Sequence, residues 1–191
     1  MSRPSLNALA AAGAALAMQF CAPRLADAPR IHALVSQCPP LDLNSTYAYL
    51  LLCHHFTDTC VVARHGQELL GFISAYQPPH RPGVLFVWQV AVAKAARGEG
   101  LGQQMLIHLV SRPGIAGIDL LETTVSPSNI PSRRMFEAFA AARDAQVSEA
   151  PLFAARDFGG EDHEDEVLFR IHGLRAAPSG EPRRPHEFAR L

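Results

Sequence analysis

Several features that mark other protein classes are scarce or missing in this sequence of 191 residues. The formal net charge is only −1, so the chain has no electrostatic footprint for nucleic acid or for an anionic membrane. The four cysteines form no CxxC pair, and their apolar surroundings indicate buried free thiols in a reducing compartment. No internal repeat or long linker occurs. The 48% hydrophobic and 18% charged content is that of one globular domain.

Two segments partly resemble a metal-binding site and a signal peptide, but neither has the full set of features. Residues 53–60, "CHHFTDTC", hold metal-ligand residue types, but the segment looks helical and no partner pair stands at zinc-finger spacing, so we predict no metal. Residues 8–18 have the length of a signal-peptide core, yet they are rich in alanine and lead directly into domain-like sequence. They are also too short to span a bilayer. We predict a weakly ordered extension (1–16), one domain (17–174) and a disordered tail rich in Pro and Arg (175–191).

Apolar periodicity and turn signals predict an alternation of strands and helices. Asp27 before Pro29, and Asn44 or Ser45, are the expected helix caps. The predicted strands cover residues 17–22, a hairpin within 59–78, 85–92, 118–125 and 165–174, and the predicted helices cover 25–38, 47–56, 102–111 and 131–142. The order β-α-α-β-β-β-α-β-α-β predicts an α/β fold with a mixed sheet flanked by helices.

The densest glycine cluster, Arg97-Gly98-Glu99-Gly100-Leu101-Gly102, separates a strand from a helix. A P-loop needs Lys-Ser/Thr after the glycines, where this chain has Gln103-Gln104. A dinucleotide fingerprint needs GxGxxG at the start of a βαβ unit, which is also absent. The remaining pattern, RxxGxG, lets the backbone close around a pyrophosphate and presents helix amides to its oxygens. A glycine turn without a ligand is the simpler alternative.

With this strand, loop and helix, the chain resembles the GCN5-related N-acetyltransferase (GNAT) superfamily. The segment "TTVSPSNIPSRRMF" adds an Asn after the next strand, followed by a helix with a small residue and an aromatic. The resemblance implies a GNAT fold, with a central mixed and mostly antiparallel sheet flanked by helices, and acetyl-CoA as co-substrate. It implies these contacts to CoA: Val90, Val92, Arg97, Gly98, Gly100, Leu101, Gly102, Gln103, Asn129 and Phe136.

One residue departs from the family pattern. Many members have a Tyr where this chain has Phe136, and that Tyr protonates the leaving thiolate. Phe136 cannot do so. A thiolate whose solution pKa is about 8.5 can leave without a strong acid, or another group can serve, so the general acid stays open.

Four further segments narrow the family: "CPPLDLNSTYAYLLLCHHF", "LFVWQVAV" with "RGEGLG", "TTVSPSN" and "HEDEVLFRI". Together they resemble the L-2,4-diaminobutyrate acetyltransferases of ectoine synthesis, over about residues 24–174. This resemblance implies a cytoplasmic homodimer that transfers acetyl to the side-chain (N4) amine of L-2,4-diaminobutyrate. No nucleic acid and no membrane are expected as partners.

The substrate carries two ammonium groups, so an acidic pocket suits it. We expect Asp42, Asn44, Tyr47, Trp88 and Glu166 to bind it, and His163 or Glu166 to act as catalytic base. Each expectation has an ordinary alternative: helix capping for Asp42 and Asn44, core packing for Trp88, and a solvated acidic turn for the segment around His163.

The residue that binds the substrate carboxylate, the identity of the amine substrate and the presence of catalytic activity each have alternatives. The substrate carboxylate has two candidate partners, Arg133 and Arg134, by charge alone. An acetyltransferase for another small diamine, such as a polyamine, is the closest rival function. A catalytically silent acetyl-CoA sensor is the rival from another class, since an intact loop predicts binding rather than turnover.

Overall fold

The computed structural model describes residues 17–115, 117–159 and 163–174. The predictions for 1–16 and 175–191 therefore lie outside the described residues. The strands are β1 (Gln19–Cys21), β2 (Val61–His65), β3 (Glu68–Tyr76), β4 (Val84–Val92), β5 (Leu120–Val125), β6 (Gln146–Phe153) and β7 (Glu166–His172). The α-helices are α2 (Ala28–Val35), α3 (Thr46–His55), α4 (Leu101–Val110) and α5 (Ile130–Ala141).

The strands form one sheet in the order β1-β2-β3-β4-β5-β7-β6. Every neighbouring pair is antiparallel except β4 and β5, which are parallel. The predicted mixed and mostly antiparallel sheet is confirmed.

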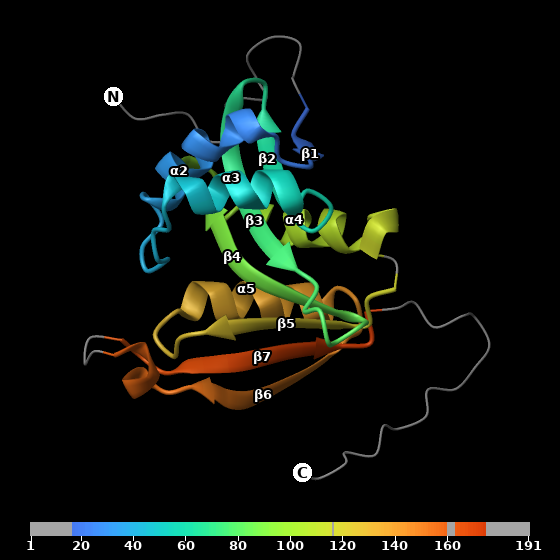
Figure 1. Cartoon of the computed structure of the whole chain (residues 1–191). Helices are drawn as coiled ribbons and strands as arrows, with labels where there is room; N and C mark the ends of the chain where they lie inside the picture. Colours follow the sequence, from blue (N-terminus) through green and yellow to red (C-terminus); the bar gives the residue numbers. More distant parts are fainter. Residues whose placement is uncertain (1–16, 116, 160–162, 175–191) are drawn as a thin grey trace, which may run out of the picture.

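The two parallel strands pair over only part of their length. Their register runs from Val84–Leu120 to Val87–Thr123, and beyond it β4 and β5 diverge, as Figure 1 shows. The second half of β4 is therefore bonded to β3 alone. This splay opens the middle of the sheet at the point where the glycine cluster follows β4.

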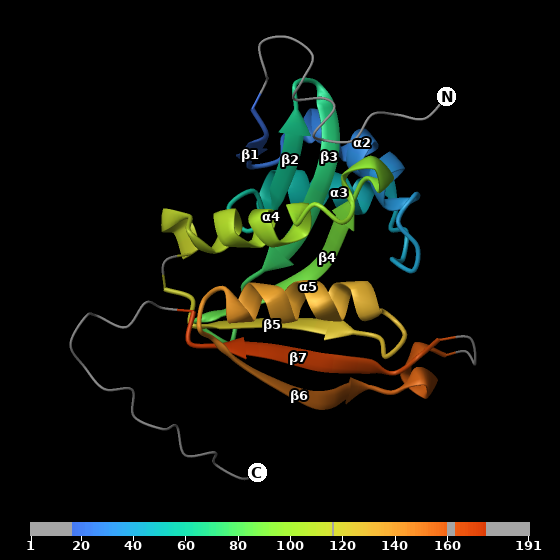
Figure 2. The same ribbon diagram turned by 180° about the vertical axis from the view of Figure 1, so that it is seen from behind.

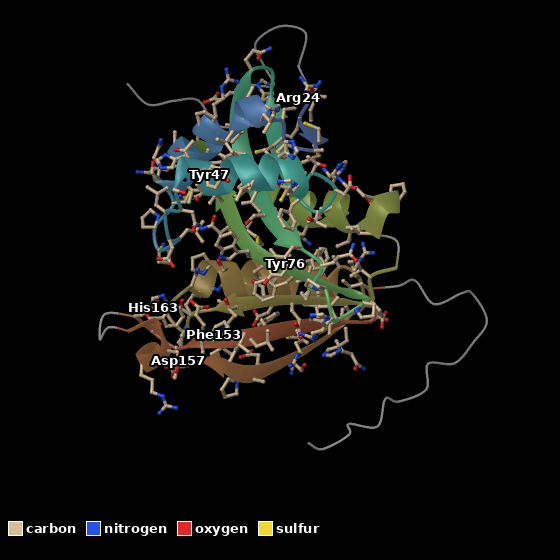
Figure 3. All side chains as sticks on the ribbon, in the orientation of Figure 1. Arg24, Tyr47, Tyr76, Phe153, Asp157 and His163 are labelled. Atoms are coloured by element: carbon tan, nitrogen blue, oxygen red, sulfur yellow. The ribbon has the colours of Figure 1, made fainter. Side chains whose placement is uncertain are left out.

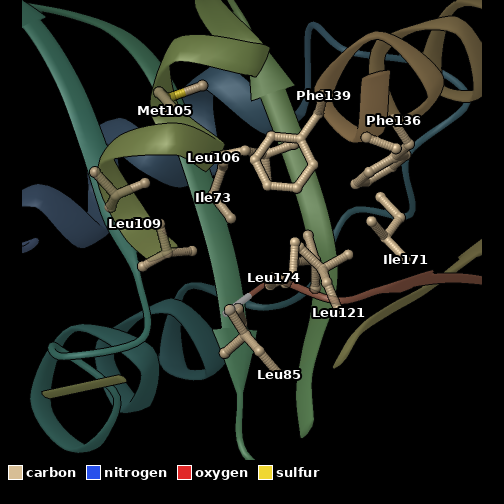
Figure 4. Close-up of a cluster of buried hydrophobic side chains, with 14 of the residues drawn as sticks. Ile73, Leu85, Met105, Leu106, Leu109, Leu121, Phe136, Phe139, Ile171 and Leu174 are labelled. Atoms are coloured by element: carbon tan, nitrogen blue, oxygen red, sulfur yellow. The ribbon is translucent and has the colours of Figure 1, made fainter. Parts of the chain in front are cut away.

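Helices cover both faces of the sheet and bury two cores. Helices α2 and α3 lie over one face, and α4 and α5 lie over the other (Figures 1 and 2). The α2–α3 core contains Ile31, Tyr49 and Phe72, all fully buried. The larger α4–α5 core gathers side chains from both halves of the sheet; Figure 4 shows Leu85, Leu121 and Phe139 among them.

Local polar groups set where the helices begin. The Ser45 hydroxyl accepts the Ala48 amide and caps α3, and the Asn129 side chain accepts the Ser132 amide and caps α5. Asp27 stands at the N-cap position of α2, but its side chain makes no capping bond to the helix. Its carboxylate instead accepts the Arg24 amide and pairs with Arg64 of β2.

The sequence prediction missed one strand, β6, and the predicted order was wrong at that place. The segment "QVSEAPLF" alternates poorly and contains Pro151, which normally argues against a strand. However, β6 bonds only to β7 and forms the edge of the sheet, where a proline needs no ladder partner on its outer side. Most of its residues are exposed, so the strand carries little apolar pattern to detect.

Candidate active site

A β-bulge in β4 prepares the centre of the site. Opposite Ser74 and Ala75 the register jumps from Gln89 to Val87, which leaves Trp88 without a partner on β3. Neighbouring strand residues normally point to opposite faces. Because of the bulge, Trp88 and Gln89 both line the same cavity, on the face that α2 and α3 partly cover.

This cavity of about 670 Å³, called here the acceptor cavity, lies at the splay between β4 and β5. Segments from distant parts of the sequence meet there. In Figure 3 Tyr76, Phe153 and His163 surround the region below α3. The lining residues are Pro40, Leu41, Asp42, Tyr76, Pro78, Arg81, Phe86, Trp88, Gln89, Glu122, Thr124, Ser126, Asn129, Leu152, Phe153, Phe158, His163, Glu166 and Leu168.

The cavity brings together most of the residues predicted to bind the acceptor. Asp42, Trp88, His163 and Glu166 line it although they come from three separate segments. Two predicted binders, Asn44 and Tyr47, are not among the lining residues. Tyr47 lies in the first turn of α3 with 68% of its surface exposed, and Figure 3 shows it on that helix, above Tyr76.

Asn129 lines the acceptor cavity and is also the N-cap of α5. Its side-chain oxygen is therefore already bonded to an amide. The two arginines considered for the substrate carboxylate are elsewhere: Arg133 of α5 pairs with Glu149 of β6, and neither it nor Arg134 lines the cavity.

A buried charge forms one wall of the cavity. Glu122 of β5 is 1% exposed and accepts hydrogen bonds from Arg81 at 2.9 Å and from Arg170 at 3.0 Å. Burial opposes the ionised form, but the hydrogen bonds and charges of the two arginines outweigh it and lower the pKa of Glu122. Glu122 is therefore a charged and fully paired carboxylate at neutral pH.

His163 and Glu166 line the cavity at the N-terminal end of β7. The His163 ring stacks on Phe158 with centroids 3.7 Å apart, and its Nδ1 lies 2.7 Å from the Glu164 carbonyl oxygen. A carbonyl only accepts, so Nδ1 carries the proton and, in the neutral ring, Nε2 carries the lone pair. The Glu166 carboxylate accepts the Ser126 hydroxyl at 2.9 Å.

The glycine loop has the backbone geometry that its sequence predicts. Gly98 and Gly100 have φ of +82° and +73°, which only glycine adopts readily, and Gly100 is the N-cap of α4. That helix has no side-chain cap among the described residues. Its first amides are thus donors of the kind that bind an anion, at the positive end of the helix dipole.

Other residues of this region have local structural partners. The Arg97 guanidinium donates to the carbonyls of Val92 and Gln37, which ties the loop to the turn that follows α2. A Cβ on Gly102 would collide with the Met135 sulfur, so this glycine also lets α4 approach α5. Phe136 is 3% exposed and packs against Phe169 in the larger core.

Two of the cysteines, Cys53 and Cys60, are poorly suited to supply a thiolate for a covalent acetyl intermediate. All four are free; three are buried and Cys21 is half-buried. Burial raises the pKa of Cys53 to about 11 and that of Cys60 to about 12. Within the described ranges, no three His, Cys, Asp or Glu side chains gather as a metal site, and no helix has the length and hydropathy to cross a membrane.

Gln89 and Glu122 are two buried polar residues of the site that sequence reasoning missed. Each is a polar side chain inside an otherwise apolar strand, "LFVWQVAV" and "IDLLETTV", and both are buried. A buried polar group must be paired, so a Gln or Glu in the middle of a central strand was the available signal.

Comparison with known proteins gives a consistent result. The family model described as "Acetyltransferase (GNAT) family" matches residues 28–141. The chain is 57% identical over 150 residues to the L-2,4-diaminobutyric acid acetyltransferase of Bordetella parapertussis, covering 78% of this chain and 81% of that protein. It is 44% identical over 147 residues to the same enzyme of Methylotuvimicrobium alcaliphilum, covering 77% and 86%.

Among solved structures, the diaminobutyrate acetyltransferase of Paenibacillus lautus superposes with a TM-score of 0.81 at 39% identity. The match covers 85% of this chain and 98% of that one. That protein was solved in complex with its substrate L-2,4-diaminobutyric acid and coenzyme A.

Proposed function

The chain belongs to the acetyltransferase (GNAT) family, and from that premise we propose that it is an L-2,4-diaminobutyrate acetyltransferase. It transfers the acetyl group of acetyl-CoA to the side-chain N4 amine of L-2,4-diaminobutyrate, as in ectoine biosynthesis. One observation carries this conclusion: a relative at 39% identity and a TM-score of 0.81 binds both L-2,4-diaminobutyric acid and coenzyme A.

We assign acetyl-CoA binding to the glycine loop and the two elements that flank it. The uncapped first amides of α4 and the positive φ of Gly98 and Gly100 fit a pyrophosphate. We include Val90, Val92, Leu101 and Gln103 through the family pattern. The backbone of β4 beyond Val87 is not paired with β5, so amides near Val90 are candidates to polarise the thioester carbonyl.

We assign diaminobutyrate to the acceptor cavity because of its charges. Asp42 and Glu166 contribute carboxylates to the lining, and two ammonium groups need such partners when water is excluded. Trp88, 43% exposed, offers a ring face to an ammonium group. The paired Glu122 is already neutralised by two arginines and is a weaker partner for the substrate.

His163 is the better candidate for the base. Its Nδ1 is engaged with the Glu164 carbonyl, so the Nε2 lone pair is the one that can accept a proton from the substrate ammonium. The neutral amine then attacks the thioester carbonyl; the C–N bond forms, the C–S bond breaks, and the nitrogen releases its second proton to the CoA thiolate or to solvent. Phe136 supplies no proton to that sulfur.

The chain's assembly and place in the cell are finer points of the same proposal. We propose a homodimer in the cytoplasm that contributes to osmoadaptation through ectoine. The family resemblance supports all three statements, and sedimentation of the purified protein tests the first.

The deciding experiment compares two acceptors that differ by one group. 1,3-Diaminopropane is diaminobutyrate without its carboxylate. With acetyl-CoA and the purified enzyme, thiol release and mass spectrometry should show N4-acetyl product from diaminobutyrate. The diamine should react with kcat/KM lower by about two orders of magnitude or more, because a site built to pair a polar group rejects an analogue that lacks it.

The rival functions have distinct outcomes in this assay. Equal rates with both acceptors would favour a general diamine acetyltransferase. Binding of acetyl-CoA without product from either acceptor would favour a sensor.

A further inference from the structure

Beneath the acceptor cavity lies a buried hydrogen-bonded chain that joins α3, β4 and the segment before α3. The Tyr49 hydroxyl donates to the Gln89 side-chain oxygen at 3.3 Å. The Gln89 side-chain NH₂ donates to the Asp42 carbonyl at 2.7 Å, and its backbone amide donates to the Ser74 hydroxyl at 3.1 Å. The Asn44 amide in turn donates to the Tyr49 oxygen at 3.4 Å.

We propose that Gln89 and Tyr49 are positioning residues that fix the segment Asp42–Asn44 and thereby set the Asp42 carboxylate for the incoming ammonium group. This inference rests on the proposed function, because its readout is the acetylation of diaminobutyrate. It assigns no substrate contact to either residue.

Because these hydrogen bonds are buried, they hold the residues in one arrangement. Tyr49 is fully buried and Gln89 is 3% exposed, so neither can exchange its partner for bulk water. Both ends of the Gln89 amide are used inside the protein: the oxygen by Tyr49 and the nitrogen by Asp42. A buried polar group that loses its hydrogen-bond partner cannot replace it with water, so the arrangement with all bonds made is strongly preferred.

The segment that it holds has no regular structure of its own. Asp42 and Leu43 are exposed and lie between α2 and α3, outside any helix or strand. The two backbone bonds, at the Asp42 carbonyl and the Asn44 amide, tether both sides of Leu43. The first bond comes from Gln89 of β4, the same strand whose bulge turns Trp88 into the cavity, and the second is made to Tyr49 of α3, which itself donates to Gln89. The segment Asp42–Asn44 is thus held in a fixed position relative to β4, the strand that leads to the acetyl-CoA loop.

Loss of the tether should have a specific kinetic signature. Asp42 would still be present, but it would sample positions away from the ammonium group. Binding of diaminobutyrate should weaken, and turnover should fall with it because misplacement of about 1 Å is costly. Acetyl-CoA binding should not change, because the loop amides of α4 do not depend on Asp42.

The first test is Gln89→Leu, which keeps most of the side-chain volume and removes both side-chain bonds. We expect kcat/KM for diaminobutyrate to fall about tenfold or more, as one buried bond at about 1.4 kcal/mol predicts. The KM for acetyl-CoA should stay within about twofold.

The second test is Tyr49→Phe, which removes a single buried hydroxyl. Tyr49 does not line the cavity, so any effect on diaminobutyrate must pass through Gln89 and the Asp42 segment. We expect the KM for diaminobutyrate to rise about threefold with acetyl-CoA unaffected, since one neutral bond is lost. This variant also decides the matter if Gln89→Leu fails to fold.

The matched control is Ile31→Val, in the same core as Tyr49. It should lower Tm by roughly 1–6 °C without touching a polar bond. If positioning is the mechanism, this variant melts earlier yet keeps the diaminobutyrate KM of the wild type.

Two results would overturn the inference: unchanged diaminobutyrate kinetics in both polar variants, or equal losses for diaminobutyrate and acetyl-CoA. Failure of the proposed function is a different observation, because the wild-type enzyme itself would then leave diaminobutyrate unmodified.

Discussion

The glycine loop and the acceptor cavity are built in opposite ways. The loop is a short continuous stretch whose chemistry comes from backbone amides and two positive φ angles. The cavity is made of side chains from five strands, β3 to β7, and several connecting segments. A backbone site can be recognised from its local sequence. A side-chain site of this kind exists only after the fold has brought its parts together.

If this contrast is correct, the two regions should respond separately to mutation. Changes in the cavity should affect diaminobutyrate and turnover, whereas changes in the loop should affect acetyl-CoA. The following predictions test that separation, beginning with the largest effect.

Removal of the proposed base should have the greatest effect on turnover. We expect His163→Ala to lower kcat about a hundredfold, the lower end of what general base catalysis contributes. The KM for acetyl-CoA should stay within about twofold. Steady-state kinetics with each substrate varied in turn would measure both. His55→Ala, an exposed histidine at the end of α3, is the control and should match the wild type. A kcat above half of the wild-type value in His163→Ala would move the base elsewhere.

The same contrast explains what the sequence could predict. The strand, glycine loop and helix were predictable because apolar runs, glycines and caps are local signals. Asp42 and Glu166 were placed at the acceptor site only through family resemblance, since no spacing rule joins positions so far apart. Strand β6 was missed because an exposed edge strand with Pro151 lacks an apolar pattern. Arg81 was missed because only the fold places it beside Glu122.

The loop should show the reverse kinetics. Gly100→Val puts a β-branched residue at φ +73°, which strains the backbone and places a side chain where the pyrophosphate is expected. We expect the KM for acetyl-CoA to rise about tenfold or more, with little change in the KM for diaminobutyrate. Gly66→Val is the control, because Gly66 has a similar φ of +60° in the β2–β3 turn. An acetyl-CoA KM raised equally in both variants would attribute the effect to strain alone.

The ion-paired cluster of Glu122, Arg81 and Arg170 should make the stability of the fold depend on pH. The folded-state pKa of Glu122 lies below the ordinary glutamate value of about 4.3. Its ionised form therefore stabilises the fold fully above about pH 4.3, and this contribution is lost as pH falls through the folded-state pKa.

Glu122→Gln should consequently lower Tm at pH 7. The cost should be about 2 kcal/mol, or roughly 4–8 °C, less than for a fully buried pair because both arginines reach solvent. The difference from the wild type should shrink in melts below about pH 4. A constant difference from pH 7 to pH 3 would show that packing, not charge, carries the effect.

The smallest effect is expected at Phe136, the position where many members of the family have a Tyr instead. Phe136 is 3% exposed, packs on Phe169 and does not line the acceptor cavity. A thiol with a pKa of about 8.5 is a fair leaving group without a strong acid. Phe136→Tyr should therefore change kcat by no more than about threefold, against the roughly 10²–10⁴ of true acid catalysis.

Phe139→Tyr, three residues further along the same helix and fully buried, controls for the cost of placing a hydroxyl in this core. The measurement is kcat at saturating concentrations of both substrates from pH 7 to pH 9. A gain of a hundredfold in Phe136→Tyr alone would mean that the native site lacks an acid that the reaction needs, and the side-chain chemistry of the acceptor cavity would then be insufficient for turnover.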